Sequence, residues 1–287
     1  MVTINKEAVS ADGTRIYAEA AGDPSNPALV CMHGFTGTSF TFHKQLANPQ
    51  LLRHVFVIAY DLRGNGRSDK PEDAAAYAGE RVAEDFRAVC EAFGVVRPVA
   101  LGWSLGAIVI LDILNHLPPG YIRGAVYSGG PALTRPLHNT FMSTWLQTTL
   151  PPLLGSSDAT VVARATVEFL DGCFGHPRTD MTYEQRMRWL GEIMFAPPPT
   201  RVVYEAVTRE RDTTHFLERM RDVPLLVLQG TEDMHVDVHK LKATFDELFS
   251  GKKDYEFVWM EGIGHCVAWE KAEEHDELIV RFMKRLS

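Results

Sequence analysis

The chain has few cysteines and no apolar run long enough to span a bilayer. The cysteines are Cys31, Cys90, Cys173 and Cys266. They are scattered and form no C-x-x-C pair, which excludes a disulfide framework and a cysteine-rich zinc site and indicates buried thiols in a reducing compartment. Residues 1–10 also lack the apolar run of a secretory signal. We therefore expect a cytoplasmic protein that does not act at a membrane.

An excess of positive charge is absent as well. The chain carries 29 Lys and Arg residues against 37 Asp and Glu residues, a formal net charge of −8, which argues against nucleic acid as a partner. With 287 residues, of which 45% are hydrophobic and 23% charged, it has the composition of a soluble globular enzyme. Its length suits one large α/β domain, or a core domain with an insertion. Monomer and homodimer both stay open.

The most informative segment is Gly102-Trp103-Ser104-Leu105-Gly106. It follows a strand-like run, 98–101, and precedes a helix-like run, 107–114. Gly-x-Ser-x-Gly in that setting predicts a nucleophile elbow, a strained strand-to-helix turn that exposes the serine hydroxyl above a sheet. The two glycines remove side chains that would collide where the helix folds back over the strand. The alternative is a glycine-rich turn before an ordinary helix.

Apolar runs alternate with amphipathic stretches along most of the chain. The patterns predict a hairpin over 2–10 and 14–20, and strands over 28–32, 54–60, 122–127, 223–228 and 255–260. They predict helices over 40–52, over 79–93 with Gly94 at its end, and over 271–285. This alternation indicates an α/β protein with a mostly parallel sheet covered by helices on both faces.

The strand rhythm breaks between residues 134 and 221. This segment is rich in aromatic residues, Met and Pro, and its ten Arg, absent Lys and ten acidic residues make it formally neutral. We interpret it as a helical cap inserted into a core domain made of residues 1–133 and 222–287. Its aromatic and Met side chains predict a largely apolar substrate pocket. The pocket walls that we predict are Trp103, Phe141, Trp145 and Met194.

A nucleophilic serine needs a base, and His265 is the best candidate. It lies in Gly262-Ile263-Gly264-His265-Cys266, just after a predicted strand, and the carboxyl ends of parallel strands are where this class of fold places its catalytic groups. The alternative for His265 is a solvated loop histidine. The nearest rival, His275, lies inside the final helix and reads as a surface residue.

The base needs an acid that orients it, and Asp233 is the best candidate. It lies in Gly230-Thr231-Glu232-Asp233, after another predicted strand, and the order Ser104, Asp233, His265 matches the order of the nucleophile-elbow enzymes. Glu232 and Asp237 compete for this role. A further alternative is an acidic loop that only caps a helix near Val238.

Two backbone amides complete the predicted chemistry. His33-Gly34-Phe35 follows the strand 28–32, so the Phe35 and Leu105 amides are the predicted oxyanion donors. The alternative for this loop is a plain glycine-containing turn. The loop 61–69, rich in Gly and alternating charges, reads as structural, and its Gly64-x-Gly66 lacks the rest of a dinucleotide signature.

His235 and His239 have the four-residue spacing of a metal site on one helix face. Because Asp233 already has a better role and no distant ligand is indicated, we predict no metal and no cofactor.

Taken together, these motifs resemble the α/β-hydrolase superfamily, and the elbow is similar to those of small cytosolic carboxylesterases. The resemblance implies an eight-stranded sheet, a cap after the sixth strand and a Ser104–His265–Asp233 triad. Epoxide hydrolases and haloalkane dehalogenases of the superfamily carry Asp at the elbow, so Ser104 argues against both. The resemblance favours hydrolysis of a small to medium, largely apolar ester or lactone. Carbon–carbon bond hydrolysis, acyl transfer, perhydrolysis and a small-molecule receptor stay open as alternatives.

Overall fold

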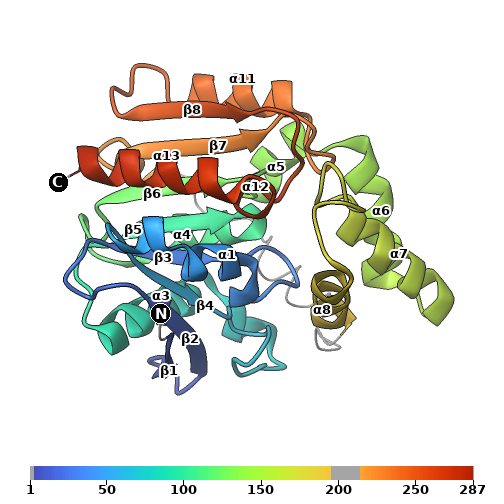
Figure 1. The fold of residues 1–287 in the computed structure, drawn as a ribbon, viewed down its shortest axis with the longest axis horizontal. Helices are drawn as coiled ribbons and strands as arrows, with labels where there is room; N and C mark the ends of the chain where they lie inside the picture. The colour runs from blue at the N-terminus through green and yellow to red at the C-terminus, as the bar shows by residue number, and fades with distance from the viewer. Residues whose placement is uncertain (1–2, 195–213, 287) are drawn as a thin grey trace.

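A computed structural model describes residues 3–194 and 214–286, and an eight-stranded sheet forms its centre (Figure 1). The strands are β1 (Ile4–Val9), β2 (Arg15–Ala21), β3 (Ala28–Met32), β4 (Phe56–Tyr60), β5 (Val99–Trp103), β6 (Gly124–Ser128), β7 (Leu225–Gly230) and β8 (Tyr255–Met260). Their order is β1-β2-β4-β3-β5-β6-β7-β8. β2 pairs antiparallel with β1 and β4, whereas the other neighbours pair in parallel. The predicted eight-stranded, mostly parallel sheet is confirmed.

Helices cover both faces of this sheet. They are α1 (His43–Ala47), α2 (Pro49–Leu52), α3 (Gly79–Phe93), α4 (Ala107–His116), α5 (Arg135–Phe141), α6 (Thr144–Gly155), α7 (Ala159–Asp171), α8 (Tyr183–Met194), α10 (Thr214–Met220), α11 (Val238–Leu248), α12 (Val267–Glu270) and α13 (Ala272–Arg285), with short 3-10 turns η1 (Ser39–Phe42), η2 (Ala74–Tyr77) and η3 (Ser104–Gly106). In Figure 1, α1 and α13 lie in front of the sheet and α3 and α4 behind it. Within the described ranges, no helix is both long and apolar enough to cross a membrane.

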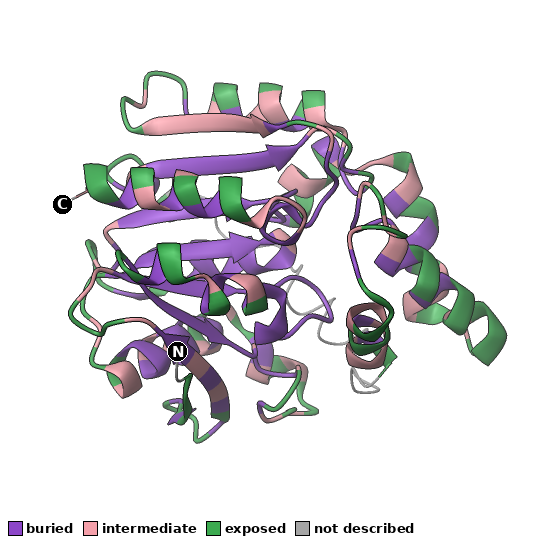
Figure 2. Ribbon diagram, viewed as in Figure 1, coloured by how far each residue is buried: buried purple, intermediate pink, exposed green. Residues whose placement is uncertain are grey.

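The hydrophobic core lies on both faces of the parallel strands. Every residue of β3, β4, β5, β6 and β7 is buried, as Figure 2 shows in purple. This burial explains why these strands read as continuous apolar runs rather than as alternating ones. All four thiols are buried too, and burial raises the pKa of Cys173 and Cys266 well above the ordinary range.

Two sequence interpretations need correction. The helix expected over 40–52 is divided into three short elements, η1, α1 and α2. The division before α2 lies at Asn48, because its side chain accepts the Gln50 N–H and so caps a new helix that has Pro49 in its first turn. His275 was expected on the surface, but it is fully buried. Its ring nitrogens contact Ser128 Oγ at 3.2 Å and Asp276 Oδ1 at 3.0 Å, because this side of α13 faces the sheet.

Helices α5 to α8 and α10 lie between β6 and β7 in the sequence. α6, α7 and α8 stand beyond the carboxyl ends of the parallel strands (Figure 1). α10 instead packs on α4, where Arg219 donates to the carbonyl of Leu117 at 2.8 Å. Residues 195–213 of the predicted cap lie outside the described residues.

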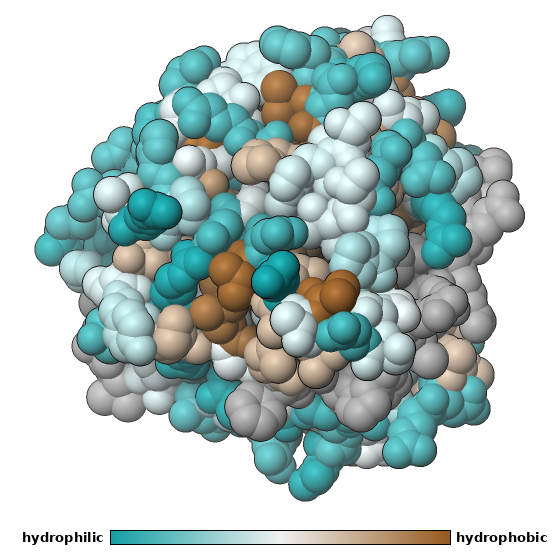
Figure 3. All heavy atoms as spheres, turned by 90° about the vertical axis from the view of Figure 1, so that its right-hand side faces the viewer, coloured by the Kyte–Doolittle hydropathy of each residue, from teal (hydrophilic) through white to brown (hydrophobic). Residues whose placement is uncertain are grey.

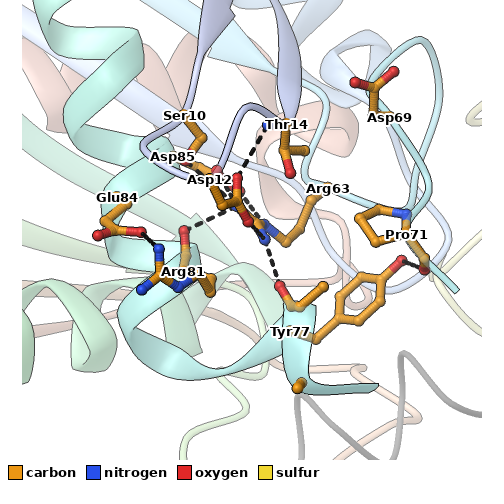
Figure 4. A network of polar contacts seen from close by, with 12 residues as sticks. Ser10, Asp12, Thr14, Arg63, Asp69, Pro71, Tyr77, Arg81, Glu84 and Asp85 are labelled. Carbon is orange, nitrogen blue, oxygen red and sulfur yellow. Dashed lines mark hydrogen bonds and ion pairs between the residues drawn. The ribbon is translucent and has the colours of Figure 1, made fainter. Parts of the chain in front are cut away.

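A buried cation holds the loop after β4 in place. Figure 4 shows the Arg63 side chain pointing toward Asp12, from the β1–β2 turn, and Asp85, from α3. Arg63 Nη2 lies 2.6 Å from Asp85 Oδ1 and Arg63 Nη1 lies 2.9 Å from Asp12 Oδ2, while both the Arg63 and Asp85 side chains are 2% exposed. Burial opposes ionisation of Asp12, but hydrogen bonds from Arg63 and Thr14 lower its pKa to about 2. The loop therefore has the structural role that its sequence indicates.

We expect Arg63→Ala to lower the free energy of unfolding by about 3–5 kcal/mol, because it leaves the buried Asp85 carboxylate without its charged partner. Urea denaturation monitored by circular dichroism measures this loss. Arg15→Ala is the matched control, since it breaks the exposed Arg15–Asp69 pair and should change the midpoint little. Equal midpoints for the two variants would contradict the structural role of Arg63.

Candidate active site

Ser104 occupies the strained turn that the sequence predicts. It is the first residue after β5 and has φ of 52°, in the left-handed region that non-glycine residues rarely adopt. A Cβ added to Gly102 would lie 2.6 Å from the backbone of Ala107, and one added to Gly106 would collide with the carbonyl of Met32. Both positions require glycine, because helix α4 begins directly against strands β5 and β3.

Asp233 and His265 form a buried pair at the ends of β7 and β8. His265 Nδ1 lies 2.8 Å from Asp233 Oδ2, and the two residues are 1% and 6% exposed. The same carboxylate accepts the Gln229 side-chain amide at 2.8 Å and the His235 backbone N–H at 2.8 Å. Burial alone would raise the pKa of Asp233, but the charge and hydrogen bond of His265 and the Gln229 amide hold this pKa below its ordinary value.

The competing carboxylates lie elsewhere. Glu232 is exposed, and Asp237 accepts the Lys240 backbone N–H at 3.1 Å as the N-cap of α11. Helix capping, which was the alternative role for Asp233, therefore belongs to Asp237.

A glycine just after β6 leaves the space that the Asp233 and His265 side chains occupy. A Cβ on Gly130 would lie 2.9 Å from Asp233 Oδ2 and would collide with the His265 ring. The Gly130 N–H donates to Gln229 Oε1 at 2.8 Å, so Gln229 links β6 to the Asp233 carboxylate. Gln229 belongs to none of the sequence motifs, although a polar residue at the end of a fully buried strand is a recognisable signal.

The loop of His265 is fixed from two sides. Trp103 Nε1 donates to the His265 carbonyl at 3.0 Å. The Glu270 carboxylate accepts the Gly264 N–H at 3.0 Å and the Gly175 N–H at 2.7 Å, which joins this loop to the segment after α7. Burial raises the pKa of Glu270 to about 7, although the two amide hydrogen bonds oppose this shift. Glu270 likewise belongs to none of the sequence motifs.

The loop after β3 carries the predicted oxyanion donor. His33 Nδ1 donates to the Gly34 carbonyl at 2.7 Å, and its Nε2 accepts the Leu62 N–H at 2.9 Å. Burial lowers the pKa of His33, which favours this neutral tautomer. Thr36 has φ of 60°, so the chain turns sharply just after Phe35. Phe35 and Leu105 both line the cavity that Ser104 lines.

A cavity of about 390 Å³ brings these groups together. Apolar side chains from the core loops, from Met142 just after α5, and from α6 and α7 make most of its wall. The lining residues that α5 itself supplies are polar, and α6 adds the polar Gln147. The lining residues are Phe35, Ser104, Leu105, Gly130, Ala132, Leu133, Thr134, Arg135, His138, Asn139, Met142, Leu146, Gln147, Leu150, Pro151, Leu154, Phe169, His235 and His265. Figure 3 views the molecule from this end and shows hydrophobic residues gathered between hydrophilic ones.

None of the four residues predicted as pocket walls is among the residues that line this cavity. Trp103 is buried beneath the site, where its ring meets Trp189 edge to face. Phe141 is fully buried against Phe245. Trp145 packs on His235 at 5.3 Å between ring centroids, and Met194 is 57% exposed at the end of α8.

Two further histidines stand in the cavity wall, and burial keeps both neutral. Burial, followed by the charge of His265, lowers the pKa of His138 to about 4 and that of His235 well below its ordinary value. His239, the other half of the rejected metal motif, packs against Trp259. In the described part of the chain, no three His, Cys, Asp or Glu residues gather in a way that could hold a metal ion.

Comparison with known proteins gives the chain a family context. A sequence model described as "alpha/beta hydrolase fold" matches residues 27–272. The non-heme chloroperoxidase of Streptomyces lividans is 27% identical over 252 residues, which cover 79% of this chain and 82% of that protein. Epoxide hydrolase A of Mycobacterium tuberculosis is 32% identical over 103 residues, but these cover only 36% of this chain and 31% of that protein.

Two solved structures match over nearly the full length. The esterase RhEst1 from Rhodococcus sp. ECU1013 is 29% identical with a TM-score of 0.83, and the match covers 99% of each chain. A Burkholderia cenocepacia protein assigned as an aryl esterase is 26% identical with a TM-score of 0.85, again over 99% of each chain.

We expect Glu270→Gln to remove a pH-dependent part of the stability. Because burial raises the pKa of Glu270 from 4.5 to about 7, the folded state binds this proton more tightly than the unfolded state does. The resulting stabilisation is fully present below pH 4.5 and is lost as the pH rises through about 7. The free energy of unfolding of the wild type, measured in urea, should therefore fall relative to that of the variant across this range.

Glu273→Gln, which changes an exposed carboxylate on α13, is the control and should shift the unfolding free energy equally at both ends of the range. A difference between wild type and Glu270→Gln that does not depend on pH would show that Glu270 does not titrate there.

Proposed function

Because the chain belongs to the α/β-hydrolase fold family, we propose that it is a serine hydrolase that cleaves a carboxylic ester or lactone through an acyl-enzyme on Ser104. One observation carries the proposal. His265, whose Nδ1 lies 2.8 Å from the buried Asp233 carboxylate, lines the same cavity as a serine held at positive φ. His265 Nε2 has no hydrogen-bond partner among the described residues, so this nitrogen is available to take the serine proton.

In the acylation step, Ser104 Oγ attacks the carbonyl carbon of the ester while His265 Nε2 accepts its proton. The hydrogen bond to Asp233 fixes the proton of neutral His265 on Nδ1 and stabilises the imidazolium that forms. The Phe35 and Leu105 amides hold the negative oxygen of the tetrahedral intermediate. The alcohol then leaves with the proton from His265. In the second step, His265 activates a water molecule that releases the carboxylic acid and frees Ser104.

The cavity indicates the class of substrate. Its wall is formed largely by Leu, Phe, Met, Ala and Pro side chains, and its volume of about 390 Å³ suits a small to medium ligand. An uncharged, largely apolar ester or lactone fits this wall best. We propose that residues 134–221 act as the cap over this cavity, on a core made of residues 1–133 and 222–287, since α5, α6 and α7 supply much of the lining. No step needs a cofactor.

The relatives suggest two other reactions, epoxide hydrolysis and perhydrolysis. A serine nucleophile is compatible with the second but not with the first. Attack of a serine hydroxyl on an epoxide would leave an ether, which has no carbonyl carbon for water to attack, so epoxide hydrolysis does not fit this nucleophile. Perhydrolysis does fit, because hydrogen peroxide in place of water would release a peracid from the same acyl-enzyme. The similarity to a chloroperoxidase over 79% of the chain favours it as the second candidate.

We expect Ser104→Ala to abolish both ester hydrolysis and covalent labelling by a serine-directed fluorophosphonate, because the nucleophilic oxygen is removed. A panel of p-nitrophenyl esters and lactones, together with gel detection of the label, measures both effects. Ser25→Ala, at an exposed loop serine, should leave both unchanged. Normal turnover in Ser104→Ala would overturn the proposed function.

We expect Asp233→Asn to fold normally and to lower kcat by up to about ten-thousandfold, because the amide no longer holds His265 in the required tautomer. Asp237→Asn, which alters only the α11 cap, is the control and should keep its turnover and its stability, because Asn caps a helix about as well as Asp does. A loss of about tenfold or less for Asp233→Asn would move the acid role to Glu232 or Asp237.

A further inference from the structure

His235 stacks face to face on His265. Their ring centroids are 4.1 Å apart and their planes differ by 20°. The His235 ring also meets Trp145 at 5.3 Å and Phe169 at 5.2 Å between centroids, and its Nε2 lies 3.7 Å from Cys173 Sγ. The aromatic rings of Trp145 from α6 and Phe169 from α7 therefore restrict the ring that packs on His265.

The backbone of His235 contacts the other member of the pair. Its N–H donates to Asp233 Oδ1 at 2.8 Å, while His265 bonds to Asp233 Oδ2. His235 is only 4% exposed. One residue thus orients the carboxylate through its main chain and meets the imidazole through its side chain.

We propose that His235 is a positioning residue for the His265–Asp233 pair, whose ring fixes the plane of His265 and presents an aromatic face to the imidazolium formed during turnover. This inference rests on the proposed serine-hydrolase function. A ring free to rotate about its side-chain bonds would direct Nε2 away from Ser104 for part of the time, whereas a stacked ring keeps one orientation. Small errors in the placement of a catalytic group are costly, because the reaction depends on near-attack geometry.

The charge state of His235 supports this role. The titratable groups that face it are His265, Asp233, His138 and Cys173. Burial, and then the positive charge of His265, lowers the pKa of His235 well below its ordinary range, despite the opposing effect of Asp233. A second cation in ring contact would destabilise the imidazolium. A neutral aromatic face attracts it instead, as in other contacts between cations and rings.

Two substitutions at this position separate the ring from its ionisable nitrogens. His235→Phe keeps an aromatic face without a titratable group, and His235→Ala removes the face but keeps the backbone N–H that bonds to Asp233. Cys173→Ala is the control, because it removes the thiol beside His235 Nε2 and leaves the ring in place. For each variant we would measure kcat and KM for the best ester of the panel, the rate constant and final extent of fluorophosphonate labelling, and the pH dependence of kcat/KM.

We expect His235→Ala to lower kcat and the labelling rate constant together, by about 10- to 100-fold, with a smaller change in KM. His235→Phe should restore both rates to within a few fold and leave the acid limb of the pH profile where it is in the wild type. Cys173→Ala should behave as the wild type does.

Other outcomes would overturn the inference. A lower extent of labelling at an unchanged rate constant in His235→Ala would indicate misfolding of a fraction of the molecules rather than mispositioning. A loss in His235→Phe as large as in His235→Ala would show that a ring nitrogen, not the stacked face, is required. An equal loss in Cys173→Ala would assign the effect to the thiol. If Ser104→Ala kept its turnover, the proposed function itself would fail, which is distinct from all three results.

Discussion

The hydrogen bond between His265 and Asp233 is the interaction on which the architecture of this site depends. A carboxylate removed from water is destabilised by several kcal/mol unless other groups replace its solvation. Here the imidazole, the Gln229 side-chain amide and the His235 main-chain N–H do so together. The Asp233 carboxylate can stay ionised in a buried position because the fold holds these donors in place. Its hydrogen bond in turn orients the His265 ring.

The sheet makes that arrangement possible. β5, β7 and β8 run parallel, so the residues that follow them meet at one edge. β6 lies between β5 and β7 and is followed directly by Gly129 and Gly130, both at positive φ. Larger side chains there would occupy the space that the imidazole and the carboxylate need. The candidate site thus results from three strand ends that supply the Ser104, Asp233 and His265 side chains and one that leaves room for them.

Periodicity and motifs predicted the parts of this protein that depend on local sequence. The helix over 79–93 and the strand over 255–260 have the observed bounds, since amphipathic spacing and buried runs are local signals. The pocket walls were not predictable in this way. Both Phe141 and Leu146 are apolar helix residues, but the first faces α11 and the second faces the cavity. Glu270 and Gly175 meet across 95 positions, and no local pattern reports such a contact.

The burial of the four thiols has a practical consequence. Cys173 and Cys266 lie on the two sides of the joint between the His265 loop and the turn after α7, where the Cys266 N–H donates to the Cys173 carbonyl at 2.9 Å. Thiolates alkylate and thiols do not, and burial raises the pKa of both groups. Alkylation of Cys173 or Cys266 by a maleimide or iodoacetamide therefore requires that this joint opens. Peptide mass spectrometry locates the modified residue. These two native cysteines can thus be used to detect opening of the joint, without an introduced probe.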